Sequence, residues 1–187
     1  MNIEISEQAN LPSRFGHFNV KAFKEGDKEH LVIYAKELEA EPLVRVHSEC
    51  LTGDAIGSLK CDCRDQLEYA LDLVAKNGGM VIYLRQEGRN IGLFNKINAY
   101  ALQDKGLNTI EANHQLGFAA DERSYEIVTY ILEYFNIKKI QLLTNNPRKI
   151  NSLENIEIIK RVPIVMESNE FNSDYLNVKR DEMGHLI

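Results

Sequence analysis

Short apolar segments separated by polar turns occupy the first quarter of the chain. Residues 18–23, 31–35 and 43–47 are rich in Val, Ile, Phe and Tyr, and polar turns such as 25–27 separate them. Segments of this length and composition predict β-strands. Because short turns join strands that run antiparallel, we expect the chain to open with antiparallel strands.

Beyond residue 60 the apolar positions change to a helical spacing. Apolar residues at i, i+3, i+4 and i+7 line one face of a helix, and this pattern predicts helices over 66–76, 93–105 and 122–135. Asp65 and Asp121 stand immediately before the first and the third of these segments. Since an aspartate in that position commonly caps a helix, we expect both to be N-caps.

Further apolar segments predict strands that alternate with these helices. They lie at 80–84, 139–143 and 156–165, whereas residues 108–120 show neither period and are expected to be irregular. Alternating strands and helices are typical of an α/β sheet covered by helices. We therefore predict a single α/β domain over residues 1–187, with a mixed sheet flanked by helices and antiparallel strands at its N-terminal side.

Charge and hydropathy restrict the class of partner. The formal net charge is −6 over 187 residues, which disfavours general electrostatic binding to nucleic acid or to an anionic membrane. The sequence has no run of 18 apolar residues, and its first 13 residues lack the basic start and apolar core of a signal peptide. We therefore expect a cytoplasmic protein that binds neither nucleic acid nor membrane.

The three cysteines of the chain lie close together, at Cys50, Cys61 and Cys63. This odd, clustered set argues against a disulfide scaffold, and three buried apolar thiols are the simple alternative to a metal site. A catalytic zinc site typically has three protein ligands and an open position, whereas a structural site has four. The cysteines therefore predict a zinc site with an open position, which a fourth ligand from His47 or His114 would make structural. Three thiolates weaken zinc as a Lewis acid, so a nearby group is needed to take or orient the proton of water.

Polar clusters follow three of the predicted strands, at residues 45–49, 85–89 and 144–149. Ligands of open α/β sheets bind beyond the carboxyl ends of the strands, although each cluster taken singly is more simply a solvated loop. From the pattern alone, 121–123 is a helix start and Tyr100 packs within a helix. Three clusters beside a metal motif nevertheless favour a phosphorylated substrate.

Five strings of residues resemble the GTP cyclohydrolase II family, which opens riboflavin biosynthesis. They are RVHSECLTGDAIGSLKCDC at 45–63, RQEGRNIGLFNKINAYALQD at 85–104, EANHQLGFAADER at 111–123, LLTNNPRK at 142–149 and MGHLI at 183–187. Long strings in a fixed order are highly specific, whereas the first 40 residues resemble the family only loosely. The resemblance implies an enzyme that converts GTP to 2,5-diamino-6-(5-phosphoribosylamino)pyrimidin-4-one, formate and diphosphate.

The resemblance also implies roles for individual residues. The zinc ligands are Cys50, Cys61 and Cys63, and the catalytic residues are Asp121 as proton acceptor, Arg123 as nucleophile and Tyr100 near the water on zinc. The positions that hold GTP match Arg45, Val46, His47, Ser48, Glu49, Gln66, Glu87, Gly88, Arg89, Thr109, Thr144 and Lys149. The family further implies one zinc ion per chain, magnesium at the substrate phosphates and a homodimer.

Three questions stay open at this point. Arginine is effectively always charged, so Arg123 is either the nucleophile or a charge stabiliser. Arg64 stands where the family often has glycine, and an arginine is costly there if the position needs a positive φ. Asn98 stands where a basic residue is common. Two rival functions are a relative that stops at the formamide and a nucleotide-binding regulator whose zinc is structural.

Overall fold

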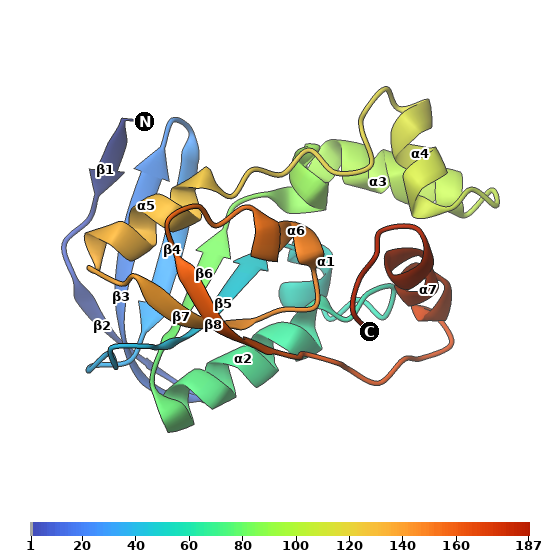
Figure 1. Cartoon of the computed structure of the whole chain (residues 1–187). Helices are drawn as coiled ribbons and strands as arrows, with labels where there is room; N and C mark the ends of the chain where they lie inside the picture. The colour runs from blue at the N-terminus through green and yellow to red at the C-terminus, as the bar shows by residue number, and fades with distance from the viewer. Residues whose placement is uncertain (1) are drawn as a thin grey trace.

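A computed structural model describes residues 2–187, and a single sheet forms its centre (Figure 1). The strands of the described chain are β1 (Ile3–Ile5), β2 (Ala9–Ser13), β3 (Gly16–Glu25), β4 (Lys28–Tyr34), β5 (Leu43–Ser48), β6 (Met80–Leu84), β7 (Lys139–Leu143) and β8 (Glu157–Val162). They are hydrogen-bonded in the order β1-β3-β4-β6-β5-β7-β8, and β2 pairs with β3. The central strands β6 and β5 are therefore enclosed by neighbours on both edges.

The sheet is mixed, which confirms the predicted fold class. Strands β1 and β2 pair antiparallel with β3, as do β3 with β4 and β4 with β6. The pairs β5–β6, β5–β7 and β7–β8 are parallel, with Val44 of β5 opposite Met80 and Leu142. Because parallel strands place their carboxyl ends at one edge, the loops after β5, β6 and β7 meet there.

Helices cover both faces of this sheet (Figure 1). They are α1 (Leu51–Asp54), α2 (Cys63–Asn77), α3 (Gly92–Gln103), α4 (Thr109–Gln115), α5 (Glu126–Tyr134), α6 (Pro147–Asn151) and α7 (Ser173–Asp181), with a 3-10 helix η1 (Glu87–Asn90). Leu132 of α5 shares one hydrophobic core with Ile82, and Val74 of α2 shares a second core with Val81. Successive strand residues point to opposite faces, so α2 and α5 bury the two sides of β6. Among the described helices, none is long and apolar enough to cross a membrane.

Two predicted helix starts are wrong. Helix α5 begins only at Glu126, and Asp121 is not its N-cap, because the Asp121 carboxylate accepts hydrogen bonds from Arg123 instead. Asp65 lies inside α2, which already begins at Cys63. In both places the local sequence predicts a cap, whereas Asp121 pairs with the side chain of Arg123 and α2 begins two residues before Asp65.

Residues 108–120 are also not irregular, because they contain α4. Asn108 accepts hydrogen bonds from the backbone N–H groups of Ile110 and Glu111, and the Glu111 carboxylate accepts one from the Asn108 backbone. This reciprocal capping box starts the helix. The apolar pattern also does not predict β1, β2, α1 and α7, which are short or largely exposed.

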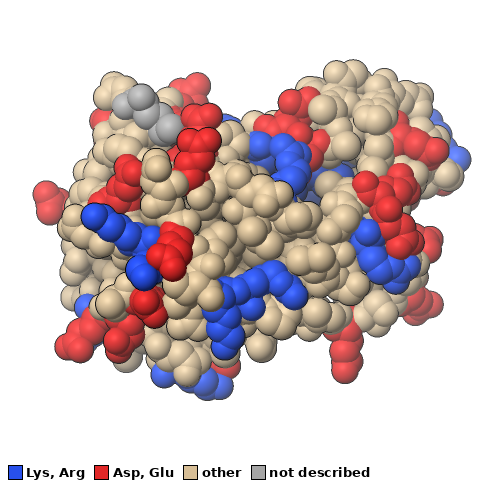
Figure 2. Space-filling model, in the orientation of Figure 1, with Lys and Arg blue, Asp and Glu red and all other residues tan. Residues whose placement is uncertain are grey.

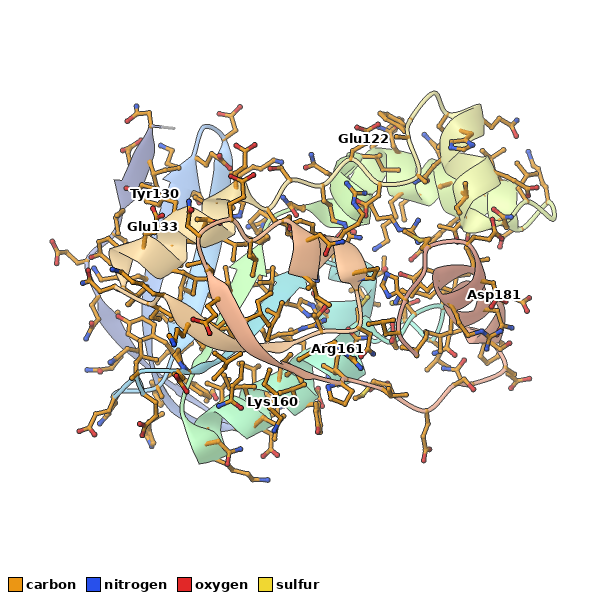
Figure 3. The ribbon with its side chains drawn as sticks, viewed as in Figure 1. Glu122, Tyr130, Glu133, Lys160, Arg161 and Asp181 are labelled. Carbon is orange, nitrogen blue, oxygen red and sulfur yellow. The ribbon has the colours of Figure 1, made fainter. Side chains whose placement is uncertain are left out.

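The loop after β7 is held by the edge of the sheet. Arg161 of β8 (Figure 3) donates from Nη1 to the Thr144 carbonyl oxygen at 3.4 Å and to Asn145 Oδ1 at 3.3 Å. Asn145 also donates to the Ile164 carbonyl oxygen at 2.5 Å, and Asn146 caps α6 by accepting from a backbone N–H of its first turn. This polar loop is therefore buried and fixed, although its composition resembles a surface turn.

Candidate active site

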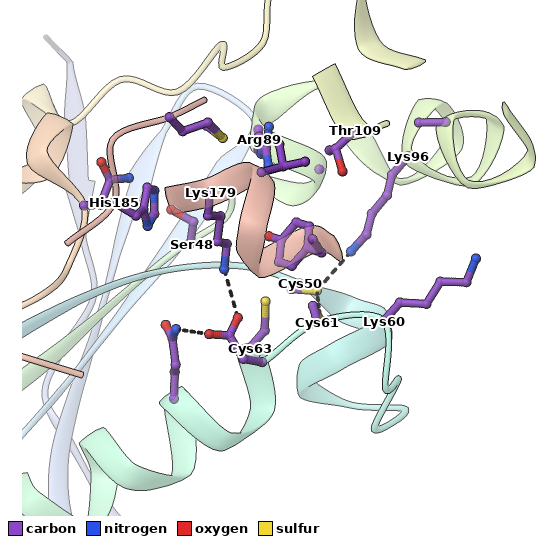
Figure 4. A pocket seen from close by; sticks show the side chains of 18 of the residues that line it. Ser48, Cys50, Lys60, Cys61, Cys63, Arg89, Lys96, Thr109, Lys179 and His185 are labelled. Atoms are coloured by element: carbon purple, nitrogen blue, oxygen red, sulfur yellow. Dashed lines mark hydrogen bonds and ion pairs between the residues drawn. The ribbon is translucent and has the colours of Figure 1, made fainter. Parts of the chain in front are cut away.

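A cavity of about 520 Å³ lies at the carboxyl ends of β5, β6 and β7, beside helices α3, α4 and α7 (Figure 4). Cavities of this size commonly bind small molecules. All of the predicted site residues line it except Val46 and Asp121. Val46 belongs to the hydrophobic core, and Asp121 is buried against Arg123. The fold thus brings together residues that are widely separated in the sequence.

The three cysteines form one cluster. Their Sγ atoms lie within 4.8 Å of one another, and Cys50 Sγ is 3.6 Å from Cys61 Sγ. Cys50 precedes α1, whereas Cys61 and Cys63 lie at the turn into α2. Gly53 packs so closely that a Cβ there would lie 2.8 Å from Cys61 Sγ and 3.1 Å from Cys50 Sγ. Glycine is therefore needed for the sulfur atoms to converge, and this donor set fits a zinc ion.

Neither histidine considered as a fourth ligand joins this cluster. His47 is buried, its Nε2 lies 3.1 Å from Asp54 Oδ1, and its ring stacks on Tyr83. His114 is exposed on α4. Within residues 2–187, the grouping of metal-binding side chains at this point consists of the three cysteines. Three donors at one point match the number of protein ligands that is typical of a catalytic zinc site.

A buried lysine that the sequence patterns do not single out lies beside the cysteines. Lys96 is 8% exposed, and its Nζ is 3.0 Å from Cys50 Sγ and 2.7 Å from Glu87 Oε1. Hydrogen bonds from the other two thiols, together with Lys96, hold the pKa of Cys50 well below its usual value. Burial opposes the charge on Lys96, but the Cys50 thiolate and Glu87 outweigh it and raise its pKa. The only signal in the sequence is spacing, since Lys96 lies three residues before buried Ala99 on the inner face of α3.

Tyr100 lies one turn further along α3 and also lines the cavity. Its Oη is 3.2 Å from Thr52 Oγ1 of α1. Burial raises the pKa of Tyr100 to about 12. The phenol therefore keeps its proton at neutral pH and is able to donate a hydrogen bond beside the cysteine cluster.

Two buried cations on β5 and α6 have neutral partners. Arg45 donates to the Leu143 carbonyl oxygen at 3.1 Å and to Gln66 Oε1 at 2.6 Å, and Lys149 donates to the Val46 carbonyl oxygen at 2.7 Å. Burial lowers the pKa of Arg45 to about 10 and the pKa of Lys149 well below its usual value. Because uncompensated buried charge is costly, an anion in the cavity would stabilise both groups.

Asp121 and Arg123 form a bidentate ion pair. Arg123 Nε lies 2.8 Å from Asp121 Oδ1 and its Nη2 lies 2.7 Å from Oδ2, while Arg148 Nη1 lies 2.9 Å from Oδ2. Burial alone would raise the pKa of Asp121, but the two arginines outweigh it and lower the pKa. Burial likewise opposes the charge on Arg123, and the Asp121 carboxylate outweighs it and raises the pKa. Arg123 is therefore a charged guanidinium held at the cavity wall.

The other predicted residues lie on loops and helix starts around the cavity. They are Ser48 and Glu49 at the end of β5, Gln66 in α2, Glu87, Gly88 and Arg89 in η1, Thr109 at the start of α4 and Thr144 after β7. Arg89 has a φ of 59°, a left-handed conformation that is uncommon for a residue with a side chain. Such strain is frequently found at functional sites, and here it directs Arg89 Nη1 to the Ala120 carbonyl oxygen at 3.1 Å.

The C-terminal segment forms a further wall, and it is the part of the site that sequence reasoning missed. Lys179 of α7 lies 2.9 Å from Asp62 Oδ1, within the Cys-Asp-Cys turn. His185 lines the cavity, and the Leu186 backbone N–H donates to the Asn145 carbonyl oxygen at 2.9 Å. Burial and nearby cations, Lys179 foremost, lower the pKa of His185 to about 3. The string MGHLI is the only sequence signal, and no role follows from it.

Positive charge is thus gathered inside the cavity. On the face shown in Figure 2, basic and acidic side chains are interspersed. Around His185 the charges that lower its pKa come from Lys179, Lys149, Arg123 and Arg89. In a chain of net charge −6, this local excess indicates a site for an anionic ligand.

Comparisons with known proteins identify the family of this chain. The profile of the GTP cyclohydrolase II family matches residues 4–163. GTP cyclohydrolase-2 of Campylobacter hominis is 70% identical over 188 residues, which cover 100% of this chain and 97% of that protein. The Campylobacter fetus subsp. fetus protein is 67% identical, and the match covers 100% of this chain and 97% of that protein. The Helicobacter pylori strain Shi470 protein is 56% identical, and the match covers 99% of this chain and 98% of that protein.

A solved structure of a two-domain 3,4-dihydroxy-2-butanone 4-phosphate synthase from A. baumannii is also similar, with a TM-score of 0.45 and 17% identity over 88% of this chain and 40% of that chain. That likeness is too weak to support an inference. The profile match and the three relatives, in contrast, extend over most or all of the chain. This chain therefore belongs to the GTP cyclohydrolase II family of enzymes.

Proposed function

We propose that this enzyme hydrolyses GTP to 2,5-diamino-6-(5-phosphoribosylamino)pyrimidin-4-one, formate and diphosphate, as the first step of riboflavin biosynthesis. The observation that carries the proposal is that one cavity holds both a three-thiol cluster and a set of buried cations. Thiolates suit a zinc ion, and arginine and lysine suit phosphates. Family membership supports GTP hydrolysis.

Cys50, Cys61 and Cys63 would hold one zinc ion per chain. When bound, zinc supplies Lewis-acid activation of water. Tyr100 is the group beside it that holds and moves a proton, because its phenol stays protonated at neutral pH. Its hydrogen bond would orient water or stabilise the charge that develops when water adds to C8 of guanine, before the ring opens.

The substrate would be held by the residues that surround the cavity. The proposed GTP-binding set is Arg45, Val46, His47, Ser48, Glu49, Gln66, Glu87, Gly88, Arg89, Thr109, Thr144 and Lys149, in which Val46 acts through its backbone carbonyl oxygen, which holds Lys149. The buried cations, together with magnesium at the substrate phosphates, would neutralise the triphosphate. The lowered pKa values of Arg45 and Lys149 support this assignment, because an anionic ligand favours the charged forms of both groups.

Arg123 acts in this proposal as a charge stabiliser instead of a nucleophile. A nucleophilic guanidine has to lose its proton, and the bidentate contact with Asp121 holds the proton more firmly. Asp121 serves as its orienting partner and as acceptor of any proton released at the phosphate. Arg123→Lys keeps the charge, so the variant should retain about a tenth of kcat. A loss of kcat beyond about 1000-fold in a folded protein would favour the covalent role.

The test of the function is incubation of the purified protein with GTP and Mg²⁺, with and without a zinc chelator, followed by mass analysis of the products. We expect the deformylated pyrimidine and formate, and we expect chelation to abolish both. A product that retains the formyl group would establish a relative that stops at the formamide. Unchanged GTP with a folded, zinc-loaded protein would establish a nucleotide-binding regulator, in which zinc removal should unfold the chain.

A homodimer in the cytoplasm and a single domain over the whole chain complete the proposal. Exposed apolar side chains lie on two adjacent segments, Ile56 and Leu59 on one and Phe94 on α3. The ion pair between Lys60 and Asp104 joins the first of these segments to the C-terminal end of α3 at 2.8 Å, whereas Phe94 lies near the start of α3. Exposed large apolar side chains of this kind favour a second copy of the chain as their cover. Phe94→Asp should therefore shift the protein from dimer to monomer in sedimentation, whereas an unchanged mass would place the contact elsewhere.

A further inference from the structure

We infer that Lys96 is a positioning residue of the metal site, which fixes the Cys50 thiolate and compensates the excess negative charge of three thiolates. The inference rests on the proposed zinc site but not on the identity of the substrate. It assigns a role to a residue for which neither the cysteine spacing nor the polar clusters provide one.

Lys96 is a buried ammonium group with two polar partners. Its side chain extends from α3 towards Cys50 (Figure 4), and only 10% of that side chain is exposed. Lysines are almost never this buried unless they are paired, because a buried ammonium without partners is strongly destabilising. Here the partners are the Cys50 Sγ at 3.0 Å and the Glu87 Oε1 at 2.7 Å. Lys96 therefore bridges a metal ligand and a carboxylate.

Glu87 extends this bridge back to the ligand loop. Its Oε2 accepts a hydrogen bond from the Leu51 backbone N–H at 2.6 Å, directly after Cys50, and its Oε1 accepts one from the Gly88 backbone at 2.8 Å. With these contacts the carboxylate joins η1, α1 and α3 around one sulfur atom. Glu87, which also lines the cavity, is consequently engaged in holding the metal site.

The backbone of the loop that carries Glu87 packs closely against the Lys96 side chain. A Cβ on Gly88 would lie 3.0 Å from the Lys96 Cβ and 3.1 Å from Ile91 Cγ1. Gly88 also has a φ of 61°, which glycine adopts without strain. The backbone therefore approaches the stem of Lys96 at a point where a side chain would push the two apart.

The charge of the site explains why an ammonium is placed there. One Zn²⁺ and three thiolates sum to −1, and the Glu87 carboxylate adds a further −1, so the Lys96 ammonium reduces the charge of this group from −2 to −1. An N–H donor on a ligand sulfur also reduces the electron density that the sulfur passes to the metal, which keeps the metal a stronger Lewis acid. Outer partners of this kind change metal affinity or activity by about 10–100-fold when they are removed.

Lys60 provides a matched control on the same side of the cavity. Its Nζ lies 5.1 Å from the centre of the Tyr100 ring, close to the 5.7 Å of Lys96. However, Lys60 pairs with Asp104, and its side chain is 44% exposed. Lys60→Met therefore removes a nearby positive charge without removing a partner of a cysteine.

The experiment measures zinc affinity by competition with a chromophoric chelator, for the full chain and the variants Lys96→Met, Lys96→Arg and Lys60→Met. We expect about 10–100-fold weaker zinc binding for Lys96→Met, values within a few-fold of the parent for Lys96→Arg, and no change for Lys60→Met. The thiolate-to-cobalt absorption band of the cobalt-substituted protein should also shift in Lys96→Met only. Circular dichroism melting checks that each variant is folded, and Lys96→Gln, which keeps a donor but no charge, is expected to weaken zinc binding if the Met variant does not fold.

Unchanged zinc affinity in a folded Lys96→Met or Lys96→Gln protein would overturn the inference, even if turnover of GTP were lost. Equal weakening in Lys96→Met and Lys96→Arg would also overturn it, because packing and not charge would then be responsible. If the parent binds zinc with the expected order of affinities among variants but does not convert GTP, the inference holds and the proposed function fails.

Discussion

The two walls of the cavity carry opposite excess charge. The metal wall consists of Cys50, Cys61, Cys63 and Lys96. The basic wall consists of Arg45, Arg123, Lys149 and Lys179, which surround the neutral imidazole of His185. On the metal wall three thiols face one ammonium group, whereas on the basic wall the carboxylates of Asp121 and Asp62 balance only part of the positive charge. Since buried charge is stable only when it is compensated, the metal wall needs a cation and the basic wall needs an anion.

The two walls also differ in how the chain builds them. The metal ligands lie within 50–63, immediately before one short helix and at the turn into the next. The basic wall collects side chains from β5, the loop before α5, α6, α7 and the residues after α7. The position of the metal ligands depends on a few turns of the backbone, whereas the position of the basic side chains depends on the whole fold. Substitutions should therefore have sharper effects on chemistry at the metal wall and broader effects on binding and stability at the basic wall.

Cys61→Ser should break the metal wall most completely. A serine hydroxyl is a poor zinc ligand, so we expect bound zinc to fall from about one per chain to near zero and formate release to fall by at least about 1000-fold. Metal analysis and a formate assay provide the measurement. Ser58→Ala, in the same loop, is the control and should change neither quantity. Retained zinc and turnover in Cys61→Ser would show that the catalytic metal lies elsewhere.

Asp121→Asn should have the largest effect on stability at the basic wall. The Asp121 side chain is 3% exposed and compensates Arg123 and Arg148. Removal of one partner of a buried pair costs about 3–5 kcal/mol, because the remaining charge is left unpaired. Urea unfolding measures this loss, and Asp181→Asn, from an exposed pair with Arg180, should leave the free energy of unfolding close to that of the parent. A comparably small loss for Asp121→Asn would mean that the arginines find other partners.

Removal of residues 183–187 should weaken substrate binding without loss of the metal. This segment brings His185 to the cavity and is held by the hydrogen bond from Leu186 to Asn145. The contact of Lys179 with Asp62 remains, so zinc content should be unchanged. We expect KM for GTP to rise about tenfold with little change in kcat, the pattern of lost binding. An unchanged KM would remove the C-terminal segment from the substrate site.

The contrast between the walls also decides what sequence reasoning finds. The strands β6 and β7 are predicted at their observed bounds, because a short, continuous apolar run between polar turns is typical of a buried strand. The cysteine cluster is confirmed as a group because its members are close in sequence and their chemistry is specific. Lys96 and Lys179 are not found, since a lysine on a helix is normally exposed and only tertiary packing buries it.

The wrong assignments have a common physical cause. Asp121 is a residue type that commonly caps helices, but its carboxylate pairs with Arg123 and Arg148 instead. Helix α4 has too few residues for a visible period, and the capping box of Asn108 and Glu111 specifies its start. In each case a side-chain hydrogen bond decides the local structure, and a pattern of apolar positions contains no information about it.

His185→Gln should change the pH dependence of stability by a small amount. The folded state holds the pKa of His185 at about 3, below the usual value of about 6.5. The unfolded chain thus binds this proton more readily, so the stability is complete above about pH 6.5 and declines as pH falls towards about 3. We expect a shallower fall of the melting temperature between about pH 7 and pH 4 in the variant. His17→Gln, at an exposed position, should keep the parent slope, and an unchanged slope in His185→Gln would mean that cations do not enclose the imidazole.

Arg64→Gly should have the smallest effect, although it introduces the residue common in the family. Arg64 lies in α2 and is absent from the positive-φ residues of the described chain, so glycine is not needed there for backbone conformation. Its Nε pairs with Glu68 at 3.0 Å, and both side chains are partly exposed. Glycine in a helix costs about 1 kcal/mol, and loss of the pair adds a few tenths. Urea unfolding should show this decrease with unchanged zinc affinity, and Arg64→Ala should show only the smaller part. A gain in zinc affinity in Arg64→Gly would mean that arginine strains the Cys61–Cys63 turn, and that the metal wall is less local than its sequence suggests.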